Sequence, residues 1–403
     1  MKRLIQSIAL ILSIPLMLTL QTACGGENDG LLLENNHSAY TNNEDIINAN
    51  VIMDEIPAVI EEVRPSTYPI LEVDNNLDDD SSTVIYFTRI DFDVIDFDSM
   101  IIPTDTPHGY IGHWYVRHIS TYLPSRVPFT YRELDAALWL KQMLYAKGFD
   151  DCQVQVQTFS HYSVSGWEDY FGLGISGLYS VKQQGWHDGH EVRRYSQNII
   201  VTIPGQSTQT IIIGAHYDSL RYSGTSDNAS GTALLMENAQ RMLAKDNYYT
   251  LIYVFFGAHE IGMLGTFYFY DSLSQEERDS IVLYINADVL IEGPALAISS
   301  GYGFQLNSNT LTEQTNAIAE SFYDTYGIEF NSSWQITGGD QLVFLYKGYT
   351  TLAFWGVCPV NFTHFLHSPR DSYDYISSKY PGMVERAMNA FALLLEAVLH
   401  EKF

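Results

Sequence analysis

Residues 210–218, Thr-Ile-Ile-Ile-Gly-Ala-His-Tyr-Asp, decide the fold class of this chain. The first six are apolar, small or β-branched, and a continuous run of this kind is typical of a strand buried on both faces of a sheet. The run ends in His216 and Asp218, so an imidazole and a carboxylate follow a buried strand directly. Such strand endings are where open α/β sheets bind their ligands.

Five further runs of strand length surround this stretch, at Val154–Phe159, Asn198–Ile203, Leu251–Phe256, Ile281–Ile285 and Thr350–Trp355. Helical periodicity predicts four helices, at Leu134–Ala146, Gly231–Leu243, Thr312–Tyr326 and Val384–Leu399. The first of these helices follows a capping-box spacing from Thr130 to Glu133. Strands alternating with helices predict an α/β fold, with a mostly parallel central sheet covered by helices on both faces.

Composition excludes several classes of protein. The 403 residues carry 21 Lys and Arg against 48 Asp and Glu, a formal net charge of −27. A nucleic-acid partner requires a basic footprint, so nucleic-acid binding is excluded. Three cysteines are too few for a scaffold held together by disulfides. A single disulfide between Cys152 and Cys358 is compatible with the sequence.

The N-terminus has the pattern of an export signal. Lys2 and Arg3 precede an apolar stretch, Ser7–Leu20, of the length of a signal-peptide core. The following residues, Leu20-Gln21-Thr22-Ala23-Cys24, resemble a bacterial lipoprotein box, with Gln21 where an aliphatic residue is usual. We therefore expect residues 1–23 to be a lipoprotein signal peptide, Cys24 to be lipidated, and the protein to be a membrane-anchored, extracytoplasmic lipoprotein of the cell envelope.

An acidic segment follows the signal. Residues 27–106 hold 19 acidic residues and two basic ones, with Asn-rich stretches that have too little apolar content to form a core. Within it, apolar residues alternate with aspartates from Ile90 to Asp98, a pattern that favours an edge strand or hairpin over an ion site. We expect residues 24–106 to be a tether with short strands, and residues 107–403 to be the folded α/β domain.

The other strand endings also carry groups that bind metal ions. Glu260 follows the strand that ends at Phe256, Asp288 follows the strand through Ile285, Asp227 precedes a helix and His367 lies in a late loop. Each alone is equally a cap or turn residue. Together with His216 they give two histidines and three carboxylates, a donor set suited to zinc or a similar divalent ion.

These residues resemble the motifs of the bacterial leucyl aminopeptidase and aminopeptidase Y group of co-catalytic di-zinc exopeptidases, whose relatives include glutamate carboxypeptidase and glutaminyl cyclase. The motif Asp-Asn-Ala-Ser-Gly is intact at residues 227–231, and His-x-x-x-Asp stands at residues 367–371. The resemblance implies two zinc ions, with Asp227 bridging them and with His216, Glu260, Asp288 and His367 as the other ligands. It gives Asp218 the role of orienting His216, and Arg126 fits the family's opening segment.

Two positions depart from the family pattern. The general base of the family would be a Glu immediately before Glu260, and this chain has His259 there. A segment resembling Ser-Asp-His-x-x-Phe reads Gly339-Asp340-Gln341-Leu342-Val343-Phe344, so Gln341 replaces a His near the substrate. The resemblance makes Asp340 and Gln341 candidate substrate-binding residues and His259 the candidate catalytic base. An imidazole can do this work, because its pKa of about 6.5 lies near the operating pH.

Three functions remain open from the sequence. The first is a zinc-dependent exopeptidase, most specifically an aminopeptidase acting on peptides, with His259 replacing the usual base. The second is an inactive homologue that keeps metal and fold and serves as an envelope binding protein, which the substitutions at His259 and Gln341 motivate. The third is an acyltransferase of the glutaminyl cyclase kind. Substrate preference and oligomeric state are not predicted.

Overall fold

The computed structural model describes residue 90 and residues 92–163, 192–302, 305–306, 309–332, 338–358 and 365–401. The predicted signal peptide 1–23, Cys24 and most of the predicted tether lie outside the described residues. Among the described residues, no helix is long and apolar enough to span a membrane. Cys152 and Cys358 are both free thiols.

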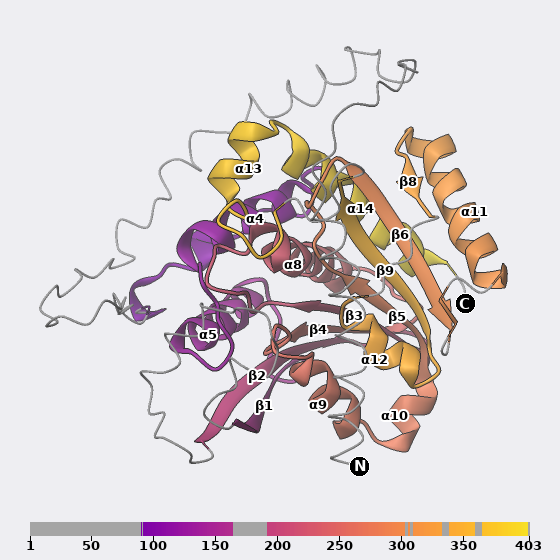
Figure 1. The fold of residues 1–403 in the computed structure, drawn as a ribbon. Helices are drawn as coiled ribbons and strands as arrows, with labels where there is room; N and C mark the ends of the chain where they lie inside the picture. The colour runs from indigo at the N-terminus through magenta and orange to yellow at the C-terminus, as the bar shows by residue number, and fades with distance from the viewer. Residues whose placement is uncertain are drawn as a thin grey trace, which may run out of the picture. The chain divides into compact units, whose positions relative to one another are not determined.

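One mixed sheet forms the centre of the domain (Figure 1). In the part of the chain that the structure describes it has nine strands, in the order β1-β2-β4-β3-β5-β9-β6-β7, with β8 paired to β6. The strands are β1 (Val154–Ser163), β2 (Val192–Ile203), β3 (Thr210–His216), β4 (Thr250–Phe256), β5 (Ile281–Ala287), β6 (Ala295–Tyr302), β7 (Gln305–Leu306), β8 (Phe330–Asn331) and β9 (Thr350–Val357).

The predicted α/β class is confirmed, but the sheet is mixed and not mostly parallel. The four central strands β4, β3, β5 and β9 are parallel to one another, whereas β1, β2, β6 and β7 pair antiparallel at the two sides. All six predicted strands are present, and β3 is buried along its whole length. Strands β6, β7 and β8 were not predicted.

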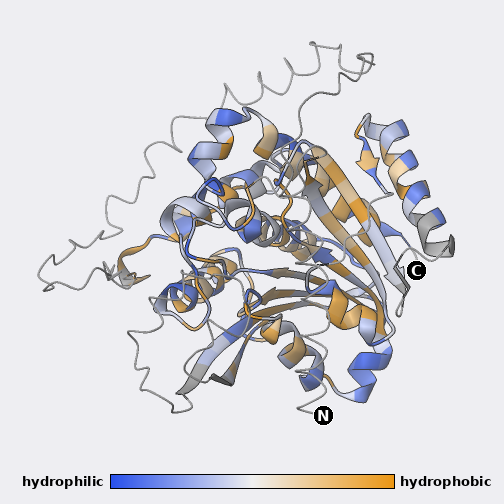
Figure 2. Cartoon of the chain, viewed as in Figure 1, coloured by the Kyte–Doolittle hydropathy of each residue, from blue (hydrophilic) through white to orange (hydrophobic). Residues whose placement is uncertain are grey.

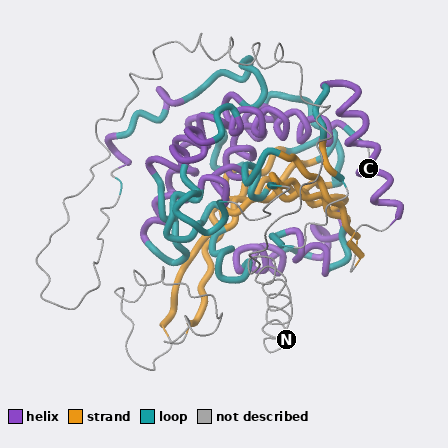
Figure 3. The backbone as a smooth tube through the Cα atoms, turned by 45° about the horizontal axis from the view of Figure 1, so that its top comes forward, coloured by secondary structure: helices purple, strands orange, loops and turns teal. Residues whose placement is uncertain are grey.

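Helices cover both faces of the sheet (Figure 3). The described α-helices are α4 (Tyr110–Tyr122), α5 (Tyr131–Ala146), α8 (Ser230–Leu243), α9 (Leu264–Ser272), α10 (Gln275–Ser280), α11 (Asn309–Tyr326), α12 (Gln341–Tyr346), α13 (Tyr373–Lys379) and α14 (Met383–His400). The four predicted helices correspond to α5, α8, α11 and α14. In Figure 2 the short α10 is hydrophilic along its length, as expected for a helix with no buried residue.

Alternate residues of one strand belong to different cores. Ile211 and Ile213 pack in the large core that α4, α5, α8 and α14 complete, whereas Ile212 packs in a second core with residues of α9 and α12. This division follows from the two-residue period of a strand. It explains why the run at 211–213 is apolar without interruption, since both faces of β3 are covered.

The expected strand or hairpin at Ile90–Asp98 is wrong. Two short 3₁₀ turns, η1 (Phe92–Val94) and η2 (Asp98–Met100), occupy this stretch. The apolar residues Phe92, Ile95 and Phe97 pack against the large core, while Asp96 accepts a hydrogen bond from the Ser99 amide at 3.3 Å. Local turn formation by aspartate therefore prevails over the two-residue hydrophobic pattern.

Gly231 lies where α8 approaches the sheet closely. A Cβ at this position would lie 2.1 Å from the backbone oxygen of Ala287, at the end of β5. We expect Gly231→Ala to lower the free energy of unfolding by about 3 kcal/mol, the upper range for overpacking. Urea denaturation of both proteins measures this change.

Gly148→Ala is the control, because a Cβ there meets nothing within 4 Å and only its φ of +96° is unfavourable. A loss of about 1 kcal/mol is expected for the control. Equal losses for the two variants would contradict the packing argument.

Candidate metal centre

The parallel strands bring the candidate residues to one edge of the sheet. His216 is the last residue of β3, and Asp288 follows β5 directly. His259 and Glu260 lie in the turn between β4 and α9. Asp227 lies in the kinked segment η3 (Thr225–Ala229) before α8, and its own backbone angles, φ −115° and ψ 89°, are not helical. Because β3, β4 and β5 run in the same direction, their carboxyl ends meet at this edge.

All five candidate ligands converge there. His216 Nε2 lies 3.2 Å from Asp227 Oδ1 and 3.3 Å from Asp288 Oδ1. On the other side, His367 Nε2 lies 3.0 Å from Asp227 Oδ2 and 3.4 Å from Glu260 Oε2. The two oxygens of Asp227 therefore face two different groups of donors, which is the arrangement of a carboxylate between two ions.

The donor atoms suit a divalent metal ion. Among the described side chains, His216 Nε2, Asp288 Oδ1 and Glu260 Oε1 are buried atoms without a hydrogen-bond partner. Buried polar atoms are almost always satisfied, so three unsatisfied ones in a single cluster need an explanation. Imidazole nitrogens and carboxylate oxygens are ligands that zinc accepts, and a zinc ion would satisfy such atoms.

The charges of the buried carboxylates also favour a bound metal ion. Burial raises the pKa of Asp288 and of Glu260, because their charged forms lose hydration. Burial opposes ionisation of Asp227 as well, but the neighbouring imidazoles of His216 and His367 outweigh burial and lower the pKa of Asp227. Three carboxylates gathered away from water are costly to ionise unless cations accompany them.

Further buried carboxylates hold the loops that carry these residues. Asp218 accepts hydrogen bonds from the amides of His259 at 3.1 Å and Glu260 at 3.0 Å. Its Oδ1 also lies 3.5 Å from His216 Nδ1. Asp218 therefore contacts one candidate ligand and fixes the turn that carries another.

Asp371 and Glu292 act in the same way on other loops. Asp371 accepts from the amides of Ser226 at 2.5 Å and Asp227 at 3.1 Å. Glu292 accepts from the amides of Phe365 and Leu366, immediately before His367. Glu292 was not predicted from the sequence, and no local pattern could reveal it, since its partners lie 73 and 74 residues away.

Arg126 fixes the segment between β3 and η3. Its buried guanidinium donates to the backbone oxygens of Tyr217 at 2.6 Å, Leu123 at 2.9 Å, Ser223 at 2.8 Å and Gly224 at 3.0 Å. These bonds give a physical reason for an arginine at this point of the chain. The positive charge also lies near the acidic cluster.

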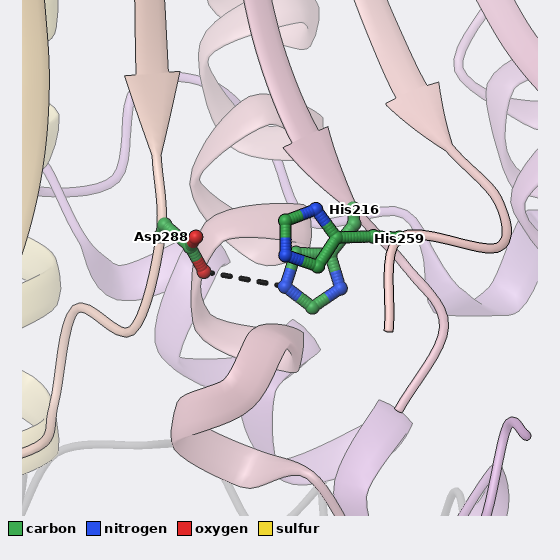
Figure 4. Close-up of side chains that lie close together, drawn as sticks. All are labelled: His216, His259 and Asp288. Carbon is green, nitrogen blue, oxygen red and sulfur yellow. Dashed lines mark ion pairs between the residues drawn. The ribbon is translucent and has the colours of Figure 1, made fainter. Parts of the chain in front are cut away.

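His259 stacks on His216 (Figure 4). The ring centroids lie 3.9 Å apart and the ring planes differ by 8°. His259 Nδ1 lies 3.0 Å from Asp340 Oδ1, and Thr266 Oγ1 donates to the same oxygen. Burial lowers the pKa of His259, but the charge of Asp340 outweighs burial and raises that pKa to about 9.

The stacking limits what His259 can bind. A donor atom of His259 lies within 4.8 Å of donor atoms of His216 and Asp288, so proximity alone would allow the three to share an ion. An imidazole nitrogen binds an ion through a lone pair in the ring plane. Nearly parallel, stacked planes have no common point near the rings, so one ion cannot lie in the plane of both.

Asp340 and Gln341 are both buried at the start of α12. Asp340 faces His259 and Thr266, so its contacts are with the protein. The Gln341 amide donates to the backbone oxygen of Gly338, and its Oε1 is a buried atom without a hydrogen-bond partner among the described residues. Neither side chain forms part of an open surface.

The fold and the two donor groups resemble an α/β domain of the zinc-metallopeptidase type. Residues 198–392 match the model of peptidase family M28. This segment contains all five candidate ligands, so the resemblance that the motifs indicate is confirmed.

Curated relatives support the same assignment. Aminopeptidase YwaD of Bacillus subtilis is 30% identical over 198 residues, which cover 48% of this chain and 42% of the relative. The probable lipoprotein aminopeptidase LpqL of Mycobacterium tuberculosis is 33% identical over 98 residues, or 24% of this chain and 20% of the relative. The chain therefore spans about half or less of the length of the curated relatives it matches.

Solved structures share the fold. BSAP, a zinc aminopeptidase from Bacillus subtilis, superposes with a TM-score of 0.54 at 17% identity and covers 73% of this chain and 95% of its own. A glutaminyl cyclase from Tannerella forsythia gives a TM-score of 0.50 at 17% identity, covering 74% of this chain and 100% of its own. At this identity the likeness establishes the fold alone.

Glu260→Gln tests the charge balance of the site. Because the folded state raises the pKa of Glu260, its ionised form costs stability at pH values above that pKa. In the presence of a chelator at pH 7, we expect the variant to melt about 2–4 °C higher than the wild type. The gain should vanish below the unfolded carboxyl pKa of about 4.3, where both states are protonated.

The same substitution should have the opposite effect with zinc present, because one ligand oxygen is lost. Scanning calorimetry with and without zinc separates the two effects. A variant that melts lower than the wild type under chelation at pH 7 would contradict the account.

Proposed function

We propose that this protein is a zinc-dependent exopeptidase, most specifically an aminopeptidase that removes N-terminal residues from peptides at a co-catalytic two-zinc site. The observation that carries the proposal is the position of Asp227, whose two oxygens face His216 on one side and His367 on the other. The match to peptidase family M28 and the names of its aminopeptidase relatives support the choice of reaction.

The proposed ligands are His216 and Asp288 for one ion, Glu260 and His367 for the other, with Asp227 between them. When bound, zinc ions polarise the scissile carbonyl and lower the pKa of a water molecule to about 7. The rest of the mechanism belongs to side chains of this chain.

His259 is the proposed general base. In the neutral form of the ring, with the Nδ1 proton directed at Asp340, Nε2 carries the lone pair and can accept a proton from the attacking water. The imidazolium can then give this proton to the leaving amine. Asp340 holds the ring in the required tautomer and orientation, a role that replaces direct substrate contact. Gln341 stays a predicted substrate-binding residue, and its Oε1 is buried in this structure.

The cellular setting is part of the proposal. We propose that residues 1–23 are a signal peptide, that Cys24 carries the lipid anchor, and that residues 24–106 tether the catalytic domain 107–403 outside the cytoplasm. A relative named as a probable lipoprotein aminopeptidase supports an envelope location.

Two alternatives have observations in their favour. The replacement of the family base by His259 favours an inactive homologue that binds peptides. The fold likeness to a glutaminyl cyclase keeps an acyltransferase open.

A panel of aminoacyl and dipeptide substrates separates these functions. We expect the wild type to contain about two zinc ions by elemental analysis and to hydrolyse N-terminal residues, with activity lost on chelation and restored by zinc. His216→Ala should lose both metal and activity. Metal without hydrolysis would favour the inactive homologue, and pyroglutamate formation from an N-terminal Gln peptide would favour the acyltransferase.

Variants of His259 test the base. His259→Ala should lower kcat about 10²–10⁴-fold while zinc content is kept, since general-base catalysis contributes about that much. His259→Glu should retain activity, because a carboxylate restores the family's base. Wild-type kcat in His259→Ala would eliminate His259 as the base.

The pH profile tests Asp340. Activity should rise with pH as the imidazole loses its proton. Because Asp340 raises the pKa of His259, Asp340→Asn should move this acidic limb to lower pH. An unmoved limb would show that another group controls it.

A further inference from the structure

Glu133 is a buried carboxylate outside the motifs that resemble the peptidase family. It lies in the first turn of α5 and is 1% exposed. Its Oε2 accepts a hydrogen bond from the Phe129 amide at 2.6 Å. Its Oε1 accepts from Ser196 Oγ at 2.7 Å and from the Ala258 amide at 2.8 Å.

The spacing from Thr130 to Glu133 predicts that Glu133 caps its own helix. Half of that capping box is present, because the Thr130 side chain accepts from the Glu133 amide. The carboxylate, however, also reaches across to Ser196 in β2 and to Ala258, which lies 125 residues away in the chain. The bond to Phe129, the residue before the N-cap, is local to the start of the helix, whereas the bond to Ala258 is not.

Ala258 opens the turn that presents His259 and Glu260. It is fully buried and has a φ of +53°, a left-handed conformation that is unfavourable for a residue with a Cβ. Such a conformation persists only where the surroundings determine it. The bond from its amide to Glu133 is one of these determinants.

Three successive amides of this turn are bound by two carboxylates. Glu133 holds the amide of Ala258, and Asp218 holds those of His259 and Glu260. Asp218 also touches His216, so it acts on both donor groups. The hydrogen bond from the Ala258 amide to Glu133 connects Glu133 to the centre through this turn.

We propose that Glu133 is a positioning residue that places Glu260 for metal binding and His259 for proton transfer. This inference rests on the proposed two-zinc function. Loss of the Ala258 bond would let the left-handed turn relax and would move Glu260, while His216 and Asp288 stay fixed at the ends of β3 and β5. Glu133 therefore acts selectively on the ion that Glu260 and His367 share.

Glu237 provides a matched control. It is also a fully buried helical glutamate, and it accepts from two backbone amides, those of Gly109 at 2.8 Å and Gly112 at 2.6 Å. Its other partner is Arg241, and none of these residues belongs to the metal centre. Changes at Glu237 report the general cost of losing a buried acceptor.

The experiment measures stepwise zinc affinity by competition with a chelating dye, on metal-free proteins shown to be folded by circular dichroism. Glu133→Leu and Glu237→Leu remove all acceptors, and Glu133→Gln and Glu237→Gln are milder variants in case a Leu variant does not fold. We expect Glu133→Leu to lower the affinity for one of the two zinc ions about 10–100-fold, the range seen when hydrogen-bond partners of metal ligands are removed. The affinity for the other zinc ion should change by less than about threefold.

Glu133→Gln should lower the affinity for the same zinc ion by a smaller factor, because one amide hydrogen bond is lost. The Glu237 variants should melt lower and bind both ions with wild-type affinity. Wild-type zinc affinities in folded Glu133 variants, or equal weakening of both ions, would overturn the inference. A wild type that binds zinc and hydrolyses no peptide would defeat the proposed function, and the zinc affinities would still decide the role of Glu133.

Discussion

The arrangement of this domain depends on a concentration of buried negative charge at the carboxyl edge of one sheet. Asp227, Glu260 and Asp288 lie together, in contact with His216 and His367, and burial opposes ionisation of Glu260 and Asp288 there. A fold can maintain such a cluster only at the expense of stability or by binding cations. His216 and His367, on either side, offer ring nitrogens of the kind that zinc accepts as ligands.

Two kinds of support hold the cluster in place. His216 and Asp288 are positioned by the parallel ladder of β3 and β5, which is continuous with the hydrophobic core. Glu260 and His367 lie on irregular backbone, and buried carboxylates hold their loops through amide hydrogen bonds. Further buried carboxyl groups therefore hold the loops that carry the charged candidate ligands. Electrostatic repulsion within the metal-free domain is the physical cost of this design, and metal binding offsets it.

The sequence predicted the elements that repeat a simple pattern and the residues that stand at their ends. Continuous apolar runs identified the central strands, because both faces of each are covered, and the endings of these runs identified His216 and Asp288. Local patterns failed where partners lie far apart in the chain. The bond from Glu133 to Ala258 and the contact of Asp340 with His259 depend on the assembled sheet. The predicted strand or hairpin after Ile90 was wrong for a related reason. Turn formation by the aspartates prevailed over the alternation of apolar and acidic residues.

Anomalous diffraction at the zinc edge from crystals of the zinc-loaded protein tests the central claim most directly. The account predicts two zinc peaks about 3.5–4 Å apart, the separation typical of two-metal hydrolases, with the Asp227 carboxylate between them. It also predicts that neither ring nitrogen of His259 lies at the zinc–nitrogen bonding distance of about 2.0–2.1 Å. A single peak, or a zinc ion bonded to His259, would contradict the account.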